Sequence, residues 1–220
     1  MGVNPTGYEN ALVIAPHADD ESFGCGGTIA KLASQGVEVN LLLGSLGYDK
    51  ESACVHQEEL EKAIKILGIA NYSVLNTHGE RYQDQMGQFY LTSHIEAEIS
   101  KRYGIVFIPY PSHHQDHIAI HQACLAALRP GTFQPSLILM YEYTYPTWVV
   151  PDQYNGRMFV DIDDTMIKKA EAIQVYQSQY RGPLSPVSAR AAIIMAQTRG
   201  LSIGVTFAEM FYIIQTRDIL

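Results

Sequence analysis

Two short segments of this 220-residue chain concentrate side chains that bind metals. The segment Ala15-Pro16-His17-Ala18-Asp19-Asp20-Glu21 directly follows the apolar run 11–15 and carries one imidazole and three carboxylates. A second cluster, His113-His114-Gln115-Asp116-His117, follows the apolar run 104–109. Imidazoles and carboxylates gathered at the ends of strands are typical of a divalent-metal site. The sequence therefore predicts two metal-binding loops about a hundred residues apart.

Short apolar runs alternate with helix-like segments, which predicts a β-α-β-α repeat. The expected strands are nearly continuous in apolar residues, as parallel strands covered on both faces are: 11–15, 37–43, 72–75, 105–109 and 137–141. Glycine is expected to end three of the helices, which are 28–35 before Gly36, 55–67 before Gly68 and 93–103 before Gly104. Further helices are expected at 119–128, 164–177 and 185–199, while 207–214 fits either a helix or a final strand.

This alternation predicts an α/β fold: a Rossmann-like, doubly wound, mainly parallel sheet with helices on both faces, in a single domain over residues 1–220. A sheet of order 3-2-1-4-5 changes direction between its first and fourth strands, and ligands bind at the carboxyl ends there. The two polar clusters follow those two strands. They are therefore expected to face each other and to build one site.

Zinc is the expected metal, because imidazole and carboxylate ligands without a thiolate suit it. The spacing favours His17 and Asp20 from the first loop and His117 from the second. His113, His114 and His121 compete for the third position, and His117 with His121 at i, i+4 is an alternative pair.

Pro16-His17-x-Asp19-Asp20-Glu21 together with His114-x-Asp116-His117 resembles the paired motifs of the LmbE-like, or PIG-L, family of zinc-dependent sugar N-deacetylases. The likeness continues to residue 214 through three later motifs: Phe159-Val160-Asp161-Ile162 with Lys168 or Lys169, then Tyr176-Gln177-Ser178-Gln179, then Arg199-Gly200 with Ala208-Glu209-x-Phe211.

The resemblance implies a hydrolase that removes the acetyl group from an N-acetylamino sugar or its conjugate. His17, Asp20 and His117 would hold the zinc, which lowers the pKa of its water toward ~7 and polarises the acetyl carbonyl. Asp19 would be the general base, and His114 would stabilise or protonate the tetrahedral intermediate. Asp116 is expected to fix the ring of His114.

Departures from the family pattern leave the substrate open. Ala18 stands where most members carry proline, and His56 stands where the family usually has a substrate-binding arginine. Glu80, Arg81 or Asp84 could replace a sugar-binding aspartate. Three alternative functions are an amidase acting on a larger N-acyl conjugate, another metal hydrolase such as a phosphoesterase, and a non-catalytic sugar-binding relative. The last of these would usually have lost the base, yet Asp19 is present.

The amino-acid composition limits the classes of partner that the protein is expected to bind. The net charge is −8 and basic residues cluster at most in pairs, so neither a nucleic acid nor an anionic membrane surface is expected as a partner. The chain has no apolar run of the roughly 18 residues that a span requires and no signal-peptide pattern at its start, which predicts a cytoplasmic protein. The three cysteines, with no C-x-x-C spacing, fit reduced thiols.

Three further features have simple interpretations. Gly24-Cys25-Gly26-Gly27 lacks the third glycine of a dinucleotide fingerprint and follows three carboxylates, so these glycines are expected to allow close packing beside the metal loop. An aromatic segment could stack on a sugar or form a contact in the expected homo-oligomer: Tyr141, Tyr143, Tyr145 and Trp148. Four histidines are expected at the surface or in packing: His56, His78, His94 and His121.

Overall fold

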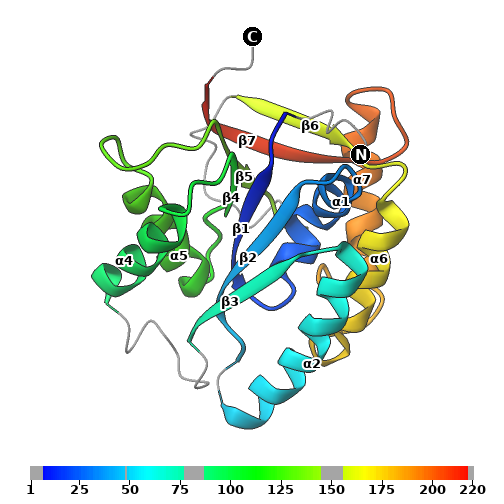
Figure 1. Ribbon diagram of the computed structural model, residues 1–220. Helices are drawn as coiled ribbons and strands as arrows, with labels where there is room; N and C mark the ends of the chain where they lie inside the picture. Colours follow the sequence, from blue (N-terminus) through cyan, green and yellow to red (C-terminus); the bar gives the residue numbers. More distant parts are fainter. Residues whose placement is uncertain (1–6, 48, 77–86, 145–155, 218–220) are drawn as a thin grey trace.

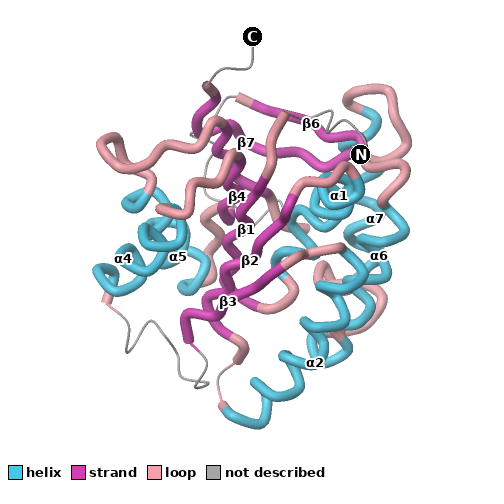
Figure 2. Tube along the Cα trace, viewed as in Figure 1, coloured by secondary structure: helices cyan, strands magenta, loops and turns pink. Residues whose placement is uncertain are grey.

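A seven-stranded sheet forms the centre of the computed structural model, which describes residues 7–47, 49–76, 87–144 and 156–217 (Figures 1 and 2). The strand order is β3-β2-β1-β4-β5-β7-β6. The parallel strands are β1 (Asn10–His17), β2 (Glu38–Ser45), β3 (Asn71–Asn76), β4 (Ile105–Pro109) and β5 (Leu137–Tyr141). Strand β7 (Ala208–Thr216) runs antiparallel to both β5 and β6 (Arg157–Asp161). The predicted doubly wound, mainly parallel sheet and its 3-2-1-4-5 order are confirmed.

Helices cover both faces of this sheet (Figure 1). Two lie on one face, α4 (Gln88–Ile99) and α5 (Gln115–Ala127). On the other face lie α1 (Asp20–Ser34), α2 (Lys50–Leu67), α6 (Met166–Val175) and α7 (Ala189–Leu201). The apolar side chains of β1, β4 and β5 are fully or almost fully buried between these layers, as their nearly continuous hydrophobicity predicts.

Several predicted boundaries were wrong. Helix α1 begins at Asp20, eight residues before the expected start at Thr28, because the glycine-rich segment continues the helix through a kink at Cys25. Gly36 and Gly68 take the expected left-handed conformation after their helices, with φ of +82° and +79°. Gly104 does not end α4, whose last residue is Ile99.

The segment left undecided between helix and strand is β7, which inserts between β5 and β6. Strand β6 pairs with the edge of β7 that faces away from β5, for example through Phe159 and Met210. Strand pairing over this distance is a tertiary contact that local periodicity does not contain. Within the described ranges, no helix is long and apolar enough to span a membrane.

The glycines after β1 allow close packing, as expected. A Cβ at Gly24 would lie 2.1 Å from the ring of Tyr141, and one at Gly27 would lie 2.7 Å from Ile162. Neither contact is possible for a larger residue without displacement of the sheet or of β6's end. Cys25 itself is fully buried with a free thiol whose pKa is raised by burial, which fits a small packing residue.

Candidate metal centre

The topology brings the two polar clusters to one edge of the sheet. Strands β1 and β4 are parallel neighbours, with Val13 opposite Phe107, so their carboxyl ends lie side by side. The first metal loop, residues 17–21, continues from β1 into α1. The second metal loop, residues 112–117, connects β4 to α5 and includes that helix's first turn. The crevice at these strand ends is where doubly wound sheets bind ligands.

Three of the predicted residues offer ligand atoms that all lie within 4.8 Å of one another: His17, Asp20 and His117. Asp20 Oδ2 lies 3.4 Å from His17 Nδ1 and 3.4 Å from His117 Nε2. This set is the one favoured by the spacing. It comprises two imidazoles and a carboxylate without a thiolate, which fits zinc and leaves a fourth position for water or substrate.

Each imidazole of this set is oriented by a hydrogen bond at the nitrogen that does not face Asp20. His17 Nε2 lies 2.9 Å from Asp116 Oδ2, which leaves Nδ1 toward Asp20. His117 Nδ1 lies 2.9 Å from the Ser112 hydroxyl, which leaves Nε2 toward Asp20. A carboxylate or hydroxyl behind a histidine ligand fixes the ring and selects its tautomer. Ser112 was not among the predicted site residues, although it lies only five residues before His117.

The charges of the three groups are interdependent. Burial acts to lower the pKa of His17, but hydrogen bonds to Asp116 and Asp20 raise it to about 10. Burial acts to raise the pKa of Asp20, but the His117 and His17 imidazoles hold it well below its usual range. The Asp20 and Asp116 carboxylates thus favour a positive charge beside them, and a bound cation would supply that charge.

Asp19 occupies a strained turn beside the ligands. Its φ is 140°, in the region that favours glycine, and it is the residue before the first turn of α1. Its N–H donates to Glu21 Oε2 at 3.1 Å, while its carbonyl accepts from Ser22 and Phe23. Burial, with the Asp20 and Glu21 carboxylates nearby, raises the pKa of Asp19.

Glu21 holds this turn and is not part of the group formed by His17, Asp20 and His117. Besides Asp19 N–H, its fully buried carboxylate accepts from Ser22 Oγ and Tyr176 Oη, each at 2.6 Å. Tyr176 follows α6, so a residue 155 positions along the chain supports the backbone of the first metal loop.

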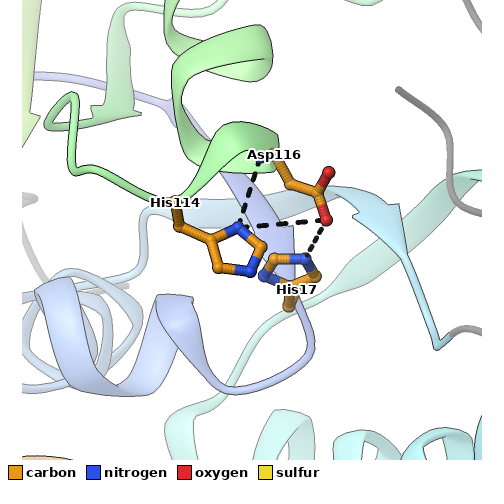
Figure 3. A group of neighbouring side chains, drawn as sticks. All are labelled: His17, His114 and Asp116. Atoms are coloured by element: carbon orange, nitrogen blue, oxygen red, sulfur yellow. Dashed lines mark hydrogen bonds and ion pairs between the residues drawn. The ribbon is translucent and has the colours of Figure 1, made fainter. Parts of the chain in front are cut away.

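The Asp116 carboxylate lies closer to His17 than to His114, the partner expected for it, and Figure 3 shows its interactions with both rings. Its carboxylate is 2.9 Å from His17 Nε2 but 4.0 Å from His114 Nδ1. His114 Nδ1 instead accepts the backbone N–H of Asp116 at 3.2 Å and caps α5. In neutral His114, Nε2 therefore carries the proton.

The other described histidines lie outside the group formed by His17, Asp20 and His117. His121 is buried, and its Nδ1 pairs with the Pro109 carbonyl at 2.9 Å, so the alternative pair with His117 does not form. His113 is exposed, and His94 bonds to its own helix at Tyr90. His78 lies outside the described residues.

A cavity of about 220 Å³ opens above the ligands, and we call it the metal cavity. Five of the predicted site residues line it, His17, Asp19, Asp20, His114 and His117, together with Ser45, His56, Tyr143, Gln179 and Arg181. His56, expected as a surface or packing residue, is half-buried in this wall, and its Nε2 lies 2.8 Å from Gln179 Nε2. Sequence position gave no reason to include Arg181.

The described residues of the predicted aromatic segment have different environments. Tyr143 stacks on His117, with ring centroids 4.6 Å apart at 22°, and lines the metal cavity. Tyr141 is fully buried and donates to the Ile14 carbonyl, so it belongs to the core. Tyr145 and Trp148 lie outside the described residues.

A buried ion pair behind the first metal loop stabilises the kink in α1. Lys169 Nζ lies 2.5 Å from Glu209 Oε1 and donates to the Phe23 carbonyl at 2.8 Å. Glu209 accepts the N–H groups of Gly27 and Thr28 at 2.9 and 2.7 Å. Helices α1 and α6 and strand β7 are joined at this point, so the helix that begins with Asp20 is held by the C-terminal part of the chain.

Comparison with known proteins identifies the class. The family described as "PIG-L: GlcNAc-PI de-N-acetylase" matches residues 12–128, and the chain belongs to this family. A probable N-acetyl-alpha-D-glucosaminyl L-malate deacetylase 2 of Bacillus cereus is 31% identical over 134 residues, which cover 54% of this chain and 60% of that protein. The chain thus matches less than two thirds of that relative's length.

The chain is also similar to two diacetylchitobiose deacetylases. The diacetylchitobiose deacetylase of Thermococcus kodakarensis is 29% identical over 78% of this chain and 70% of its own length. The structure of N,N'-diacetylchitobiose deacetylase from Pyrococcus horikoshii with its inhibitor MPG superposes with a TM-score of 0.74 at 23% identity, covering 95% of this chain and 85% of that one. That likeness establishes the shared fold.

Proposed function

We propose that this protein is a zinc-dependent hydrolase that removes the acetyl group from an N-acetylamino sugar or its conjugate. The observation that carries the proposal is the placement of the ligand set beside Asp19 and His114 in one cavity of about 220 Å³. The names of the relatives from Bacillus cereus and Thermococcus kodakarensis, both deacetylases of acetylated sugars, support the substrate class.

His17, Asp20 and His117 would hold the metal, which when bound supplies a Lewis acid for water activation and carbonyl polarisation. Asp19 accepts the proton of the attacking water, since its carboxylate lines the same cavity. The strained backbone at Asp19 and the Glu21 contact fix the position of that carboxylate.

His114 donates a hydrogen bond to the oxygen of the tetrahedral adduct. Because Nδ1 is occupied by the Asp116 N–H, the donor is Nε2–H, and the ring can donate while neutral. Burial and the His17 and His117 imidazoles lower the pKa of His114, which favours this neutral form. When the adduct collapses, the C–N bond breaks, and the proton taken up by Asp19 can pass to the leaving amine, giving acetate and an amino sugar.

The test is amine and acetate release from a panel of N-acetylamino sugars and their conjugates, using protein whose metal content is known by elemental analysis. We expect release in the metal-loaded protein, loss with a chelator, and recovery when zinc is restored. N-acyl conjugates with longer acyl groups and phosphate esters belong in the same panel. Release only from those compounds would contradict the proposal and favour a broader amidase or a phosphoesterase.

A further inference from the structure

We propose that a second cavity, next to the metal cavity, binds the aglycone of a sugar conjugate, and that this aglycone is an apolar group with an anionic substituent. This inference rests on the proposed deacetylase function and names its substrate class. The cavity has a volume of about 410 Å³ and lies between α6, the turn after it and the start of α7. We call it the aglycone cavity. The residues that line it include Phe23, Ile173, Tyr180, Pro183, Val187 and Arg190.

The two cavities share part of their walls. Phe23, Gln179 and Val187 line both of them. Phe23 lies in the first turns of α1, and its carbonyl is fixed by Lys169. A ligand held at the metal by its acetamido group can therefore extend past these three residues. The aglycone cavity is the larger of the two, about 410 against 220 Å³, so it has room for more than a sugar hydroxyl.

The walls of the aglycone cavity suit a flat apolar group. Phe23, Ile173 and Ala192 form a small buried cluster, against which Val187 packs. Tyr180 lines the cavity with half of its surface exposed, and its ring face is suited to stacking. Exposed aromatic and aliphatic surface in a concave site is a common feature of ligand pockets.

Charge at the cavity favours an anion. Among the described residues that line it, none is an aspartate or glutamate, whereas the protein as a whole has 23 acidic and 15 basic residues. Arg190, exposed in the first turn of α7, lines the aglycone cavity, and Arg181 lines the adjoining metal cavity. Because none of the described lining residues is an anion, the Arg190 guanidinium is the charged group that an anionic aglycone would meet in this cavity.

The turn between the cavities is firmly held, which makes the shared wall a fixed feature. Ser178 donates from its N–H and hydroxyl to the two oxygens of Glu59 at 2.9 and 2.6 Å. Gln179 contacts His56, and Arg181 Nη1 donates to the Ser178 carbonyl at 2.7 Å. Helix α2 thereby positions the residues over which the aglycone would pass.

The test is calorimetric binding of 2-amino-2-deoxyglucosides to the full chain, because these compounds are products and do not turn over. Both anomers of the methyl, phenyl, 4-carboxyphenyl, 4-phosphonophenyl and 4-trimethylammoniophenyl glycosides are compared. We expect the phenyl glycoside to bind about tenfold more tightly than the methyl glycoside. Either anionic substituent should add about threefold, since the exposed guanidinium contributes modestly, and the cationic substituent should add nothing.

Variants locate the effect. Arg190→Gln should remove the gain from the anionic substituent and leave the phenyl glycoside unchanged, while Lys168→Gln, an exposed cation on α6 that does not line either cavity, should change neither. Ala189→Phe, which places a ring in the cavity, should remove the aryl gain and leave methyl glycoside binding intact. The ligand series on the unaltered protein keeps the test valid if that variant does not fold.

Equal binding of methyl and aryl glycosides, within about twofold, would overturn the inference. Tighter binding of the cationic than of the anionic ring would overturn its charge component. Turnover of acetylated methyl and aryl glycosides is measured in parallel. Release without any aglycone preference would contradict the aglycone cavity alone, whereas a binding preference without any release would contradict the deacetylase proposal alone.

Discussion

The two metal loops contribute to the same cavity but are stabilised by different parts of the chain. The first metal loop contains a strained residue, Asp19, and depends on Glu21, Tyr176 and the Lys169 ion pair, two of which come from the C-terminal third. The second metal loop is stabilised mainly by itself. Within residues 112–117, the Ser112 hydroxyl and the His114 ring accept backbone N–H groups, and no residue has positive φ.

This difference separates two ways to build a site. The second loop's geometry follows from capping of α5, so it is encoded locally. The first loop holds an unfavourable backbone conformation, which persists only where surrounding contacts determine it. Substitutions at the distant residues that hold the first loop should therefore disturb that loop, whereas the second loop should respond mainly to substitutions within residues 112–117.

The largest expected effect is a loss of turnover when Asp19, the strained residue, is substituted. Asp19→Asn keeps the size of the side chain and tolerates positive φ, but it removes the base. We expect turnover of an acetylated sugar to fall by about 10² to 10⁴-fold with metal content unchanged. The matched control is Asp164→Asn at an exposed site. Activity that stays within about threefold of wild type would exclude Asp19 as the base.

The remote support of the first loop is tested at the ion pair. Lys169→Met leaves the Glu209 carboxylate buried without its cation, so we expect the free energy of unfolding to fall by about 3–5 kcal/mol in urea titrations. Lys169→Met with Glu209→Gln should recover part of this loss. If Lys169→Met costs less than about 1 kcal/mol, the loop does not depend on this contact.

One contact between the two loops joins the Asp116 carboxylate to the His17 ring. Asp116→Asn keeps the shape but weakens the hydrogen bond that orients the imidazole, and we predict a 10- to 100-fold loss of zinc affinity in competition titrations. Gln115→Glu, an exposed neighbour, serves as a control for local charge. An Asp116→Asn affinity equal to that of wild type would separate Asp116 from the metal site.

The smallest expected effect is on the pH dependence of the unfolding free energy, and it comes from His121 in α5. Burial lowers the pKa of His121 below 6.5, although the Pro109 carbonyl acts against this. The folded state therefore resists protonation, so the stability this group contributes is present above pH 6.5 and is lost as the pH falls below that value. In His121→Asn, unfolding free energy measured from pH 7.5 to 5 should fall less steeply than in wild type. Parallel curves would show that His121 titrates normally.

Much of the fold was predictable because it is local. The ranges of β4 and β5 match those expected, since short buried parallel strands are continuous apolar runs bounded by polar residues. The position of β7 was not predictable, because its pairing with β6 depends on residues about fifty positions away. The early start of α1 was missed because its glycines and Asp20 have low helix propensity, and contacts such as Glu209 with Gly27 overcome this.

The site residues likewise fall into those that could be predicted from the sequence and those that could not. His17, Asp20 and His117 could be selected from spacing and topology, and the structure brings them together. The partner of Asp116 could not, because His17 lies 99 residues away and competes with a nearby His114. The place of His56 in the cavity wall likewise depends on a contact with Gln179, 123 residues away. The single-domain organisation, the homo-oligomer and the cytoplasmic location stay predictions.

The measurement that tests the central claim most directly is the metal content of purified protein by elemental analysis, compared among wild type, His17→Ala and His94→Ala. His94 is an exposed histidine of α4 and serves as the matched control. The account predicts about one zinc per chain in wild type and His94→Ala and almost none in His17→Ala, with acetate release following metal content. Equal metal in all three proteins would contradict the assignment of the metal centre.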